Sequence, residues 1–116
     1  MYMTIEIIRK PIALDNIKRL AEETFGDMVK MVVDVERQII AAGGELHSDA
    51  ESVLLEDGSQ QRNLWGINFF PGRPEGNRTE FVSLINIRPS QGNRGQEIED
   101  PQIRQVIGDI MREKIA

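Results

Sequence analysis

Apolar residues in this chain occur in short stretches, and the spacing within each stretch is the strongest constraint on the fold. Residues 4–9 alternate apolar and polar side chains and are rich in β-branched residues, which predicts a strand that ends before Pro11. Residues 64–70 and 81–88 alternate in the same way and are the strongest strand candidates. The segment between them, residues 71–78, contains two prolines and two glycines and is therefore predicted to be a long hairpin loop.

Two segments have the spacing of amphipathic helices. Residues 15–25 carry apolar side chains every three or four positions, which predicts a helix with Asp15 as its N-cap and Gly26 as its terminator. Ser48 and Glu51 fit a capping box, in which each side chain bonds an amide at the start of a helix. A second helix is therefore predicted to begin at Ser48.

A third helix is predicted near the end of the sequence. Asp100 followed by Pro101 is typical of a helix start. The apolar face of this helix is formed by Ile103, Val106, Ile107, Ile110 and Met111. The elements together predict one α+β domain over residues 1–116, in the order β-α-β-β-α-β-β-α. We expect a mainly antiparallel sheet of about five strands, with the three helices on one face.

Residues 28–46 fit two different periods. Alternate positions in the first half are apolar, as in a strand. A helical stripe is also present: Met28, Met31, Val32, Val35 and Ile39. The β-branched residues favour two strands, over residues 28–36 and 38–46, joined by a tight turn near Arg37. One helix over residues 28–42, ending at the glycine pair that follows, is the alternative.

Charge is unevenly distributed along the chain. The net charge of −5 comes from 19 acidic and 14 basic residues, which argues against a general affinity for nucleic acid or for anionic membranes. Residues 34–57 carry seven acids and Arg37 as their only base, whereas residues 58–96 carry five arginines and two glutamates. This asymmetry is typical of an interaction surface, either within the fold or between the two copies of a homodimer.

Amide and guanidinium groups form the first candidate site. If the apolar residues of the two strongest strands face the core, then Asn68, Asn86 and Arg88 lie together on the opposite face of the sheet. The following loop adds Gln91, Asn93 and Arg94. Such groups can bind a carboxylate or a phosphate, with arginine as a bidentate donor. In the alternative interpretation, the asparagines bond loop backbone and Arg88 pairs with an acid from residues 34–57.

Carboxylates and one imidazole form the second candidate site. Asp34 and Glu36 share a face of the predicted strand, and His47 and Asp49 follow close to the second helix. These ligand types suit Mg²⁺ or Mn²⁺, and they would make the protein a metal-dependent hydrolase or phosphodiesterase. The alternative is that Asp49 stabilises the first turn of a helix. A lysine expected in carboxylate nucleases is absent, because Arg37 stands at that position.

Three parts of the sequence resemble a known family when taken together. They are VVDVER with GGELHSDAE, LLEDGS with LWGIN, and LINIRPSQGN. These strings are similar to a family of short, uncharacterised bacterial proteins described as a domain of unknown function. The resemblance extends over residues 28–103. It implies a stand-alone cytoplasmic protein, and it implies no activity, cofactor or catalytic residue.

Several chemistries have no residues to perform them. The chain has no cysteine, so it has no disulfide, thiolate metal site or cysteine nucleophile, as is usual for a protein of the reducing cytoplasm. It has one histidine, and it has neither a phosphate-binding loop nor a dinucleotide fingerprint. We therefore expect no cofactor, and a small cytoplasmic interaction or small-ligand (anion)-binding module that works as a monomer or homodimer. The metal-dependent hydrolase is the alternative.

Overall fold

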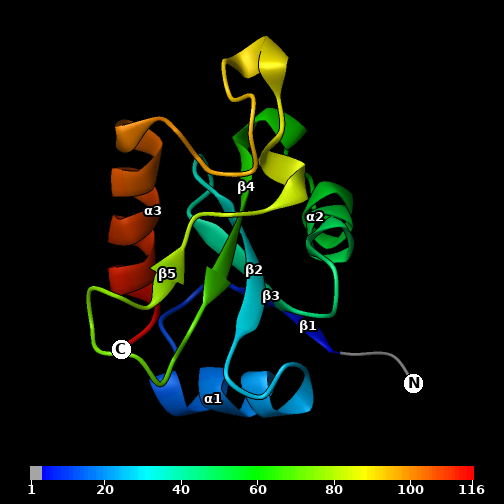
Figure 1. Cartoon of the computed structure of the whole chain (residues 1–116). Helices are drawn as coiled ribbons and strands as arrows, with labels where there is room; N and C mark the ends of the chain where they lie inside the picture. The colour runs from blue at the N-terminus through cyan, green and yellow to red at the C-terminus, as the bar shows by residue number, and fades with distance from the viewer. Residues whose placement is uncertain (1–3) are drawn as a thin grey trace.

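The computed structural model describes residues 4–116. They form a five-stranded antiparallel sheet and three helices (Figure 1). The strands are β1 (Ile5–Ile8), β2 (Val29–Asp34), β3 (Ile39–Gly43), β4 (Leu64–Phe69) and β5 (Thr79–Glu80). The helices are α1 (Leu14–Glu23), α2 (His47–Glu56) and α3 (Pro101–Lys114). The order across the sheet is β1-β3-β2-β4-β5. The predicted α+β class and the approximate order of elements are confirmed.

The hairpin β2–β3 settles the ambiguity of residues 28–46 in favour of two strands. The strands pair antiparallel, with Asp34 opposite Ile39. The chain reverses because the Asp34 Oδ1 accepts the backbone N–H groups of Glu36 and Arg37, both at 2.9 Å. Gln38 then adopts a left-handed conformation with φ of 58°. The alternative of one helix over residues 28–42 is wrong, because Asp34 ends the first strand with a side-chain turn.

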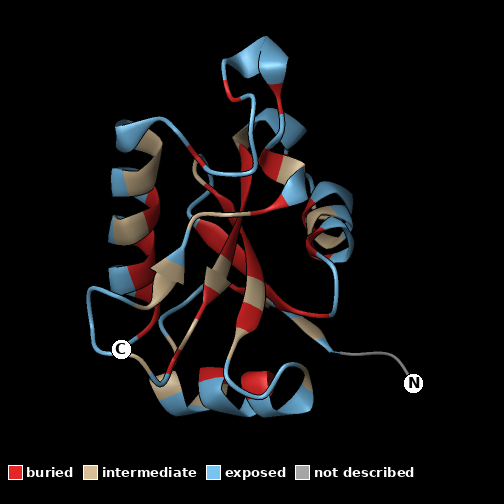
Figure 2. Ribbon diagram, in the orientation of Figure 1, coloured by how far each residue is buried: buried red, intermediate tan, exposed pale blue. Residues whose placement is uncertain are grey.

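Both faces of the sheet are covered by helices (Figures 1 and 2). A large core lies between the sheet and helices α1 and α3, and it contains Met31 and Trp65. A small core lies between the opposite face and α2, and it contains Val32, Leu54 and Leu64. The expectation of helices on one face is wrong, because consecutive residues of the central strands are buried on opposite sides.

Two of the three predicted helix caps differ from the structure. Helix α1 begins at Leu14, so Asp15 lies in its first turn and Ala13 is the N-cap. Helix α2 begins at His47, which puts Ser48 inside the helix and leaves its N-cap without a side-chain bond. Acidic groups in these first turns act on the helix dipole rather than as caps. The cap of α3 is confirmed, because the Asp100 Oδ1 accepts the Gln102 N–H at 2.8 Å.

The predicted strand over residues 81–88 is wrong. Strand β5 ends at Glu80, and Val82 forms an isolated bridge with Glu97 instead of continuing along β4. The Ser83 Oγ then accepts the Ile85 N–H at 3.2 Å and starts a 3₁₀ turn, η2 (Leu84–Asn86). Two more such turns are η1 (Gln61–Asn63), which precedes β4, and η3 (Pro89–Gln91), which follows η2. Residues 84–97, here called the 84–97 loop, project from the sheet (Figure 1).

Residues near the two ends of the described chain are joined. Ile12 and Ile115 form a parallel bridge, with the Ile12 N–H donating to the Lys114 carbonyl at 2.8 Å. The Lys114 Nζ donates to the Arg9 carbonyl at 3.0 Å. This clasp attaches the end of α3 to the segment between β1 and α1. No helix among residues 4–116 is long and apolar enough to span a membrane.

Candidate functional site

The side chain of Asn86 takes the place of a strand partner for β4. Its Oδ1 accepts the Gly66 N–H at 2.8 Å, and its Nδ2 donates to the carbonyls of Gly66 and Gln96, both at 3.0 Å. Asn86 is fully buried. This arrangement requires glycine at position 66, because a Cβ there would lie 2.5 Å from the Ser83 Cβ. The amide therefore continues the hydrogen bonding of the sheet where the backbone has turned away.

Arg88 is bound mainly to backbone oxygens. Its guanidinium donates to three carbonyls, those of Gln61, Leu64 and Ile85. Its Cζ lies 4.7 Å from the centre of the Trp65 ring, and its Nη2 lies 3.7 Å from a carboxylate oxygen of Glu51. Burial lowers the pKa of Arg88 below its usual value, and the Glu51 charge opposes that change. These contacts agree with the interpretation in which Arg88 pairs with an acid from residues 34–57.

Asn93 closes the 84–97 loop from inside. Its Nδ2 donates to three carbonyls, those of Asn86, Gly95 and Glu97, at 2.8 to 3.0 Å. Its Oδ1 accepts the Glu99 N–H at 2.9 Å. Every hydrogen-bonding group of this buried amide therefore has a protein partner. The neighbouring backbone adds two bonds between Arg88 and Asn93, at 2.7 and 3.1 Å.

The six residues of the predicted anion site are brought together only in part. Asn86, Arg88 and Asn93 meet inside the 84–97 loop, where backbone groups occupy their polar atoms. Gln91 is exposed and donates to the Arg62 carbonyl at 3.1 Å, and Arg94 is exposed. Asn68 lies on β4, and its Nδ2 donates to the Val82 carbonyl at 3.4 Å. These donors thus bind the fold together instead of lining one opening.

The four residues of the predicted metal site do not converge. Asp34 uses one oxygen in the turn of the β2–β3 hairpin, and Glu36 is exposed in that turn. His47 lies at the start of α2, where its Nε2–H donates to the Ile67 carbonyl at 2.7 Å, and Asp49 is exposed. Among residues 4–116, no three histidine or acidic residues are arranged to hold a metal ion. The donor set does not fit Mg²⁺ or Mn²⁺.

His47 belongs instead to a small polar cluster on the α2 face of the sheet. Burial lowers the pKa of its imidazole to about 4, and the charge of Lys30 contributes in the same direction. Lys30 is opposite Asn68 in the register of β2 and β4, and the Asn68 Oδ1 is buried without a partner in the described chain. Sequence reasoning missed Lys30, because only strand register brings it to this cluster. The neutral imidazole acts here as a hydrogen-bond donor.

Three exposed apolar side chains belong to the same two parts of the fold as the Glu51–Arg88 pair, namely α2 and the 84–97 loop. Leu84 is 70% exposed and Ile87 is 43% exposed, although Ile87 was expected in the core. Leu55, 40% exposed, lies one helical turn after Glu51 on α2, which contacts η2. Leu55, Leu84 and Ile87 are together called the loop surface. Figure 2 shows the 84–97 loop largely exposed beside α2.

Comparison with known proteins identifies a family and no individual relative. No curated protein and no solved structure matches the chain. A family model described as "Protein of unknown function (DUF5674)" matches residues 6–114. The match includes every strand and helix except the first residue of β1. The chain therefore belongs to this family of proteins of unknown function, as the resemblance of its sequence segments predicted.

Proposed function

We propose that this protein is an interaction module that associates with a second copy of itself through the loop surface. The observation that carries the proposal is the fixed exposure of Leu84, the most exposed large apolar side chain among the described residues. Ser83 caps the turn that contains Leu84, and Asn86 bonds the end of that turn to β4. An apolar side chain held outward by a rigid support is typical of a binding surface.

Rigidity of the 84–97 loop supports binding rather than simple connection. Asn86, Arg88 and Asn93 are all buried, and they bond backbone groups on both sides of the loop. A loop ordered in this way loses little conformational entropy when it meets a partner. Burial of Leu55, Leu84 and Ile87 in an interface would also remove apolar area from water.

Charges around the loop surface favour a second copy as the partner. Among residues 4–116, the one ion pair that joins the acidic segment 34–57 to the basic segment 58–96 is Glu51–Arg88. Glu56 on α2 and Arg62 beside the loop are exposed and have no ion-pair partner within that range. A two-fold axis through the loop surface would bring the acidic side of one copy against the basic side of the other.

Sedimentation equilibrium with matched variants tests the proposal. We expect a dimer at micromolar concentration in about 50 mM salt, weakened in about 1 M salt because screening shortens the reach of the charges. Leu84→Asp should yield a monomer, whereas Val106→Asp should leave the dimer unchanged. Val106 is the control because it is 39% exposed on α3, which packs on the face of the sheet opposite α2. A wild-type monomer at every concentration and salt would overturn the proposal.

A charge reversal distinguishes the two-fold arrangement from apolar contact alone. Arg62→Glu should weaken the dimer about fivefold or more at low salt and have little effect at high salt. Arg19→Glu, an exposed residue of α1, is the matched control and should change dimerisation by less than about twofold. Equal weakening by both variants would mean that net charge alone is responsible, and it would contradict the two-fold charge pairing.

A further inference from the structure

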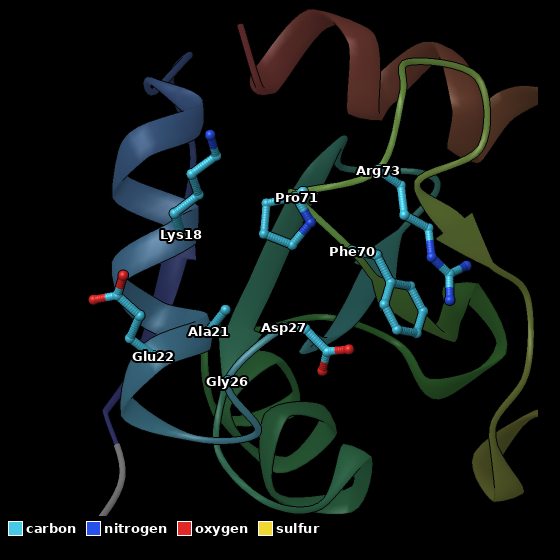
Figure 3. Close-up of a pocket in the computed structure, with 9 residues that line it drawn as sticks. Lys18, Ala21, Glu22, Gly26, Asp27, Phe70, Pro71 and Arg73 are labelled. Carbon is cyan, nitrogen blue, oxygen red and sulfur yellow. The ribbon is translucent and has the colours of Figure 1, made fainter.

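A cavity of about 440 Å³ lies between α1 and the segment that follows β4 (Figure 3). Its apolar lining is formed by Ala21, Phe70 and Pro71, and glycines 26 and 72 contribute no side chain. Charged side chains stand around this lining: Lys18, Glu22, Asp27 and Arg73. The volume falls within the range of small-molecule sites, and an apolar lining with few charged groups is typical of them.

The walls of the cavity are fixed by backbone bonds. Helix α1 is terminated by Gly26, which has a φ of 91° and donates its N–H to the Ala21 carbonyl at 2.7 Å. On the other side, the Phe70 N–H donates to the Arg78 carbonyl at 2.7 Å. Pro71 is buried beside it. A Cβ at Gly26 would meet no atom within 4 Å, which is consistent with open space at that wall.

Some charged side chains around the cavity have a partner within the protein and others do not. Arg73 is already engaged, because its Cζ lies 3.6 Å from the centre of the Phe70 ring and its Nη1 lies 3.3 Å from the Glu80 carboxylate. Lys18 and Asp27 form no ion pair or side-chain hydrogen bond with any residue from 4 to 116. Figure 3 shows Lys18 on α1 and Asp27 on the segment after it, at different sides of the opening. Glu22 likewise forms no ion pair or side-chain hydrogen bond among residues 4–116, so one cation and two carboxylates are available to a ligand.

We propose that this cavity binds a small zwitterionic organic molecule. Its ammonium group would pair with Asp27, its carboxylate with Lys18, and its apolar body would lie against Ala21, Phe70 and Pro71. Glu22, one turn from Lys18, adds negative charge on the same helix and favours the ammonium end. A ligand with one charge would pair either with the carboxylates or with Lys18, and it would leave the opposite charge facing it unpaired. This inference is independent of self-association, because α1 and α2 lie on opposite faces of the sheet.

Titration of the ¹⁵N-labelled protein with three matched probes tests the inference. The probes are 6-aminohexanoate, hexylamine and hexanoate, each added to about 10 mM. We expect 6-aminohexanoate to shift the amide signals of Gly26 and Gly72, with a Kd at least about threefold below that of either singly charged probe. Running the same titration on Leu84→Asp separates this result from the dimer, and the shifts should be retained.

Charge-removing variants identify the groups responsible. Asp27→Asn and Lys18→Gln should each weaken 6-aminohexanoate binding about fivefold or more. Glu23→Gln is the matched control, because Glu23 lies on α1 but lines a different depression with Glu6 and Asn16. Its effect should be less than about twofold. The proposal is overturned if no probe shifts the cavity amides, or if hexylamine binds as tightly as 6-aminohexanoate and Lys18→Gln has no effect.

Discussion

The side-chain amide of Asn86 anchors the 84–97 loop to β4. Replacement by alanine leaves the N–H and the carbonyl of buried Gly66 without their side-chain partner, whereas the Gln96 carbonyl keeps the Ser83 N–H at 3.1 Å. We expect Asn86→Ala to lower the free energy of unfolding by about 2–4 kcal/mol, measured by urea denaturation. Gln96→Ala is the control, because Gln96 contributes its backbone carbonyl and should lose less than about 0.5 kcal/mol. Equal losses would contradict this role for Asn86.

His47 makes the stability depend on pH. Burial lowers its pKa from 6.5 to about 4 in the folded protein, whereas the unfolded chain takes up a proton near 6.5. The unfolded state therefore binds more protons between these values. The stabilisation is complete above pH 6.5 and falls as the pH drops toward 4, by at most about 3 kcal/mol.

The variant His47→Gln isolates this effect, because glutamine can still donate to the Ile67 carbonyl but does not titrate. Its unfolding free energy should be flatter than that of the wild type between pH 6.5 and about 4. Arg9 and Arg37 lower the pKa of Asp57 below its usual 3.8, so the contribution of Asp57 is lost only at lower pH. Both proteins should therefore lose stability alike below pH 3.8. Parallel profiles at higher pH would contradict the assignment to His47.

At the scale of elements, the turn η2 fits against β4 only because Gly66 lacks a side chain. Gly66→Ala would bring a Cβ to 2.5 Å from the Ser83 Cβ, so we expect a loss of about 2–4 kcal/mol in urea denaturation. Gly95→Ala is the matched control in the same loop, because its Cβ would meet nothing within 4 Å. The double variant Gly66→Ala with Ser83→Gly should recover part of the loss. Failure of that recovery would show that the contact with Ser83 is not responsible.

Local spacing predicted most elements and missed those that depend on distant partners. The three helices follow from a period of 3.6 in consecutive residues, and the β2–β3 hairpin follows from β-branched residues, since residues 28–46 fit both periods. Residues 81–88 also have a period of two, yet the partner that turns them away from the sheet is Gly66, 20 positions before Asn86. The same distance separates His47 from the Ile67 carbonyl, so its bond could not be predicted. The residues next to Asn86 and His47 in the sequence do not indicate which distant backbone group each side chain binds.

The sequence likewise predicted part of the candidate sites and missed the rest. The pairing of Arg88 with an acid from residues 34–57 was one of two interpretations, and Glu51 is that acid. The cavity had no sequence signal, because Lys18 and Phe70 are far apart in the chain and belong to no shared pattern. Asp34 suggested a ligand for a metal, although its position before a reversal of the chain is equally typical of a turn.

For the whole molecule, the two cores share one sheet and should unfold together. Leu54 is fully buried in the small core, and Trp65, the single tryptophan, is buried in the large one. Leu54→Ala should destabilise the protein by about 2–5 kcal/mol. The thermal transition of Trp65 fluorescence should therefore move to lower temperature together with the circular dichroism of the helices. An unchanged Trp65 transition would mean that the cores unfold separately.

The clasp between Lys114 and Arg9 joins groups 105 positions apart, which sets an order of events during synthesis. At about 5–20 residues per second, a ribosome needs roughly 5–20 s to add the residues that separate them. For most of that interval the α3 side of the large core stays open, because Ile107, Ile110 and Met111 are made only near its end. The nascent chain therefore has a defined period in which its sheet is exposed to chaperones, and the clasp closes only after Lys114 has emerged.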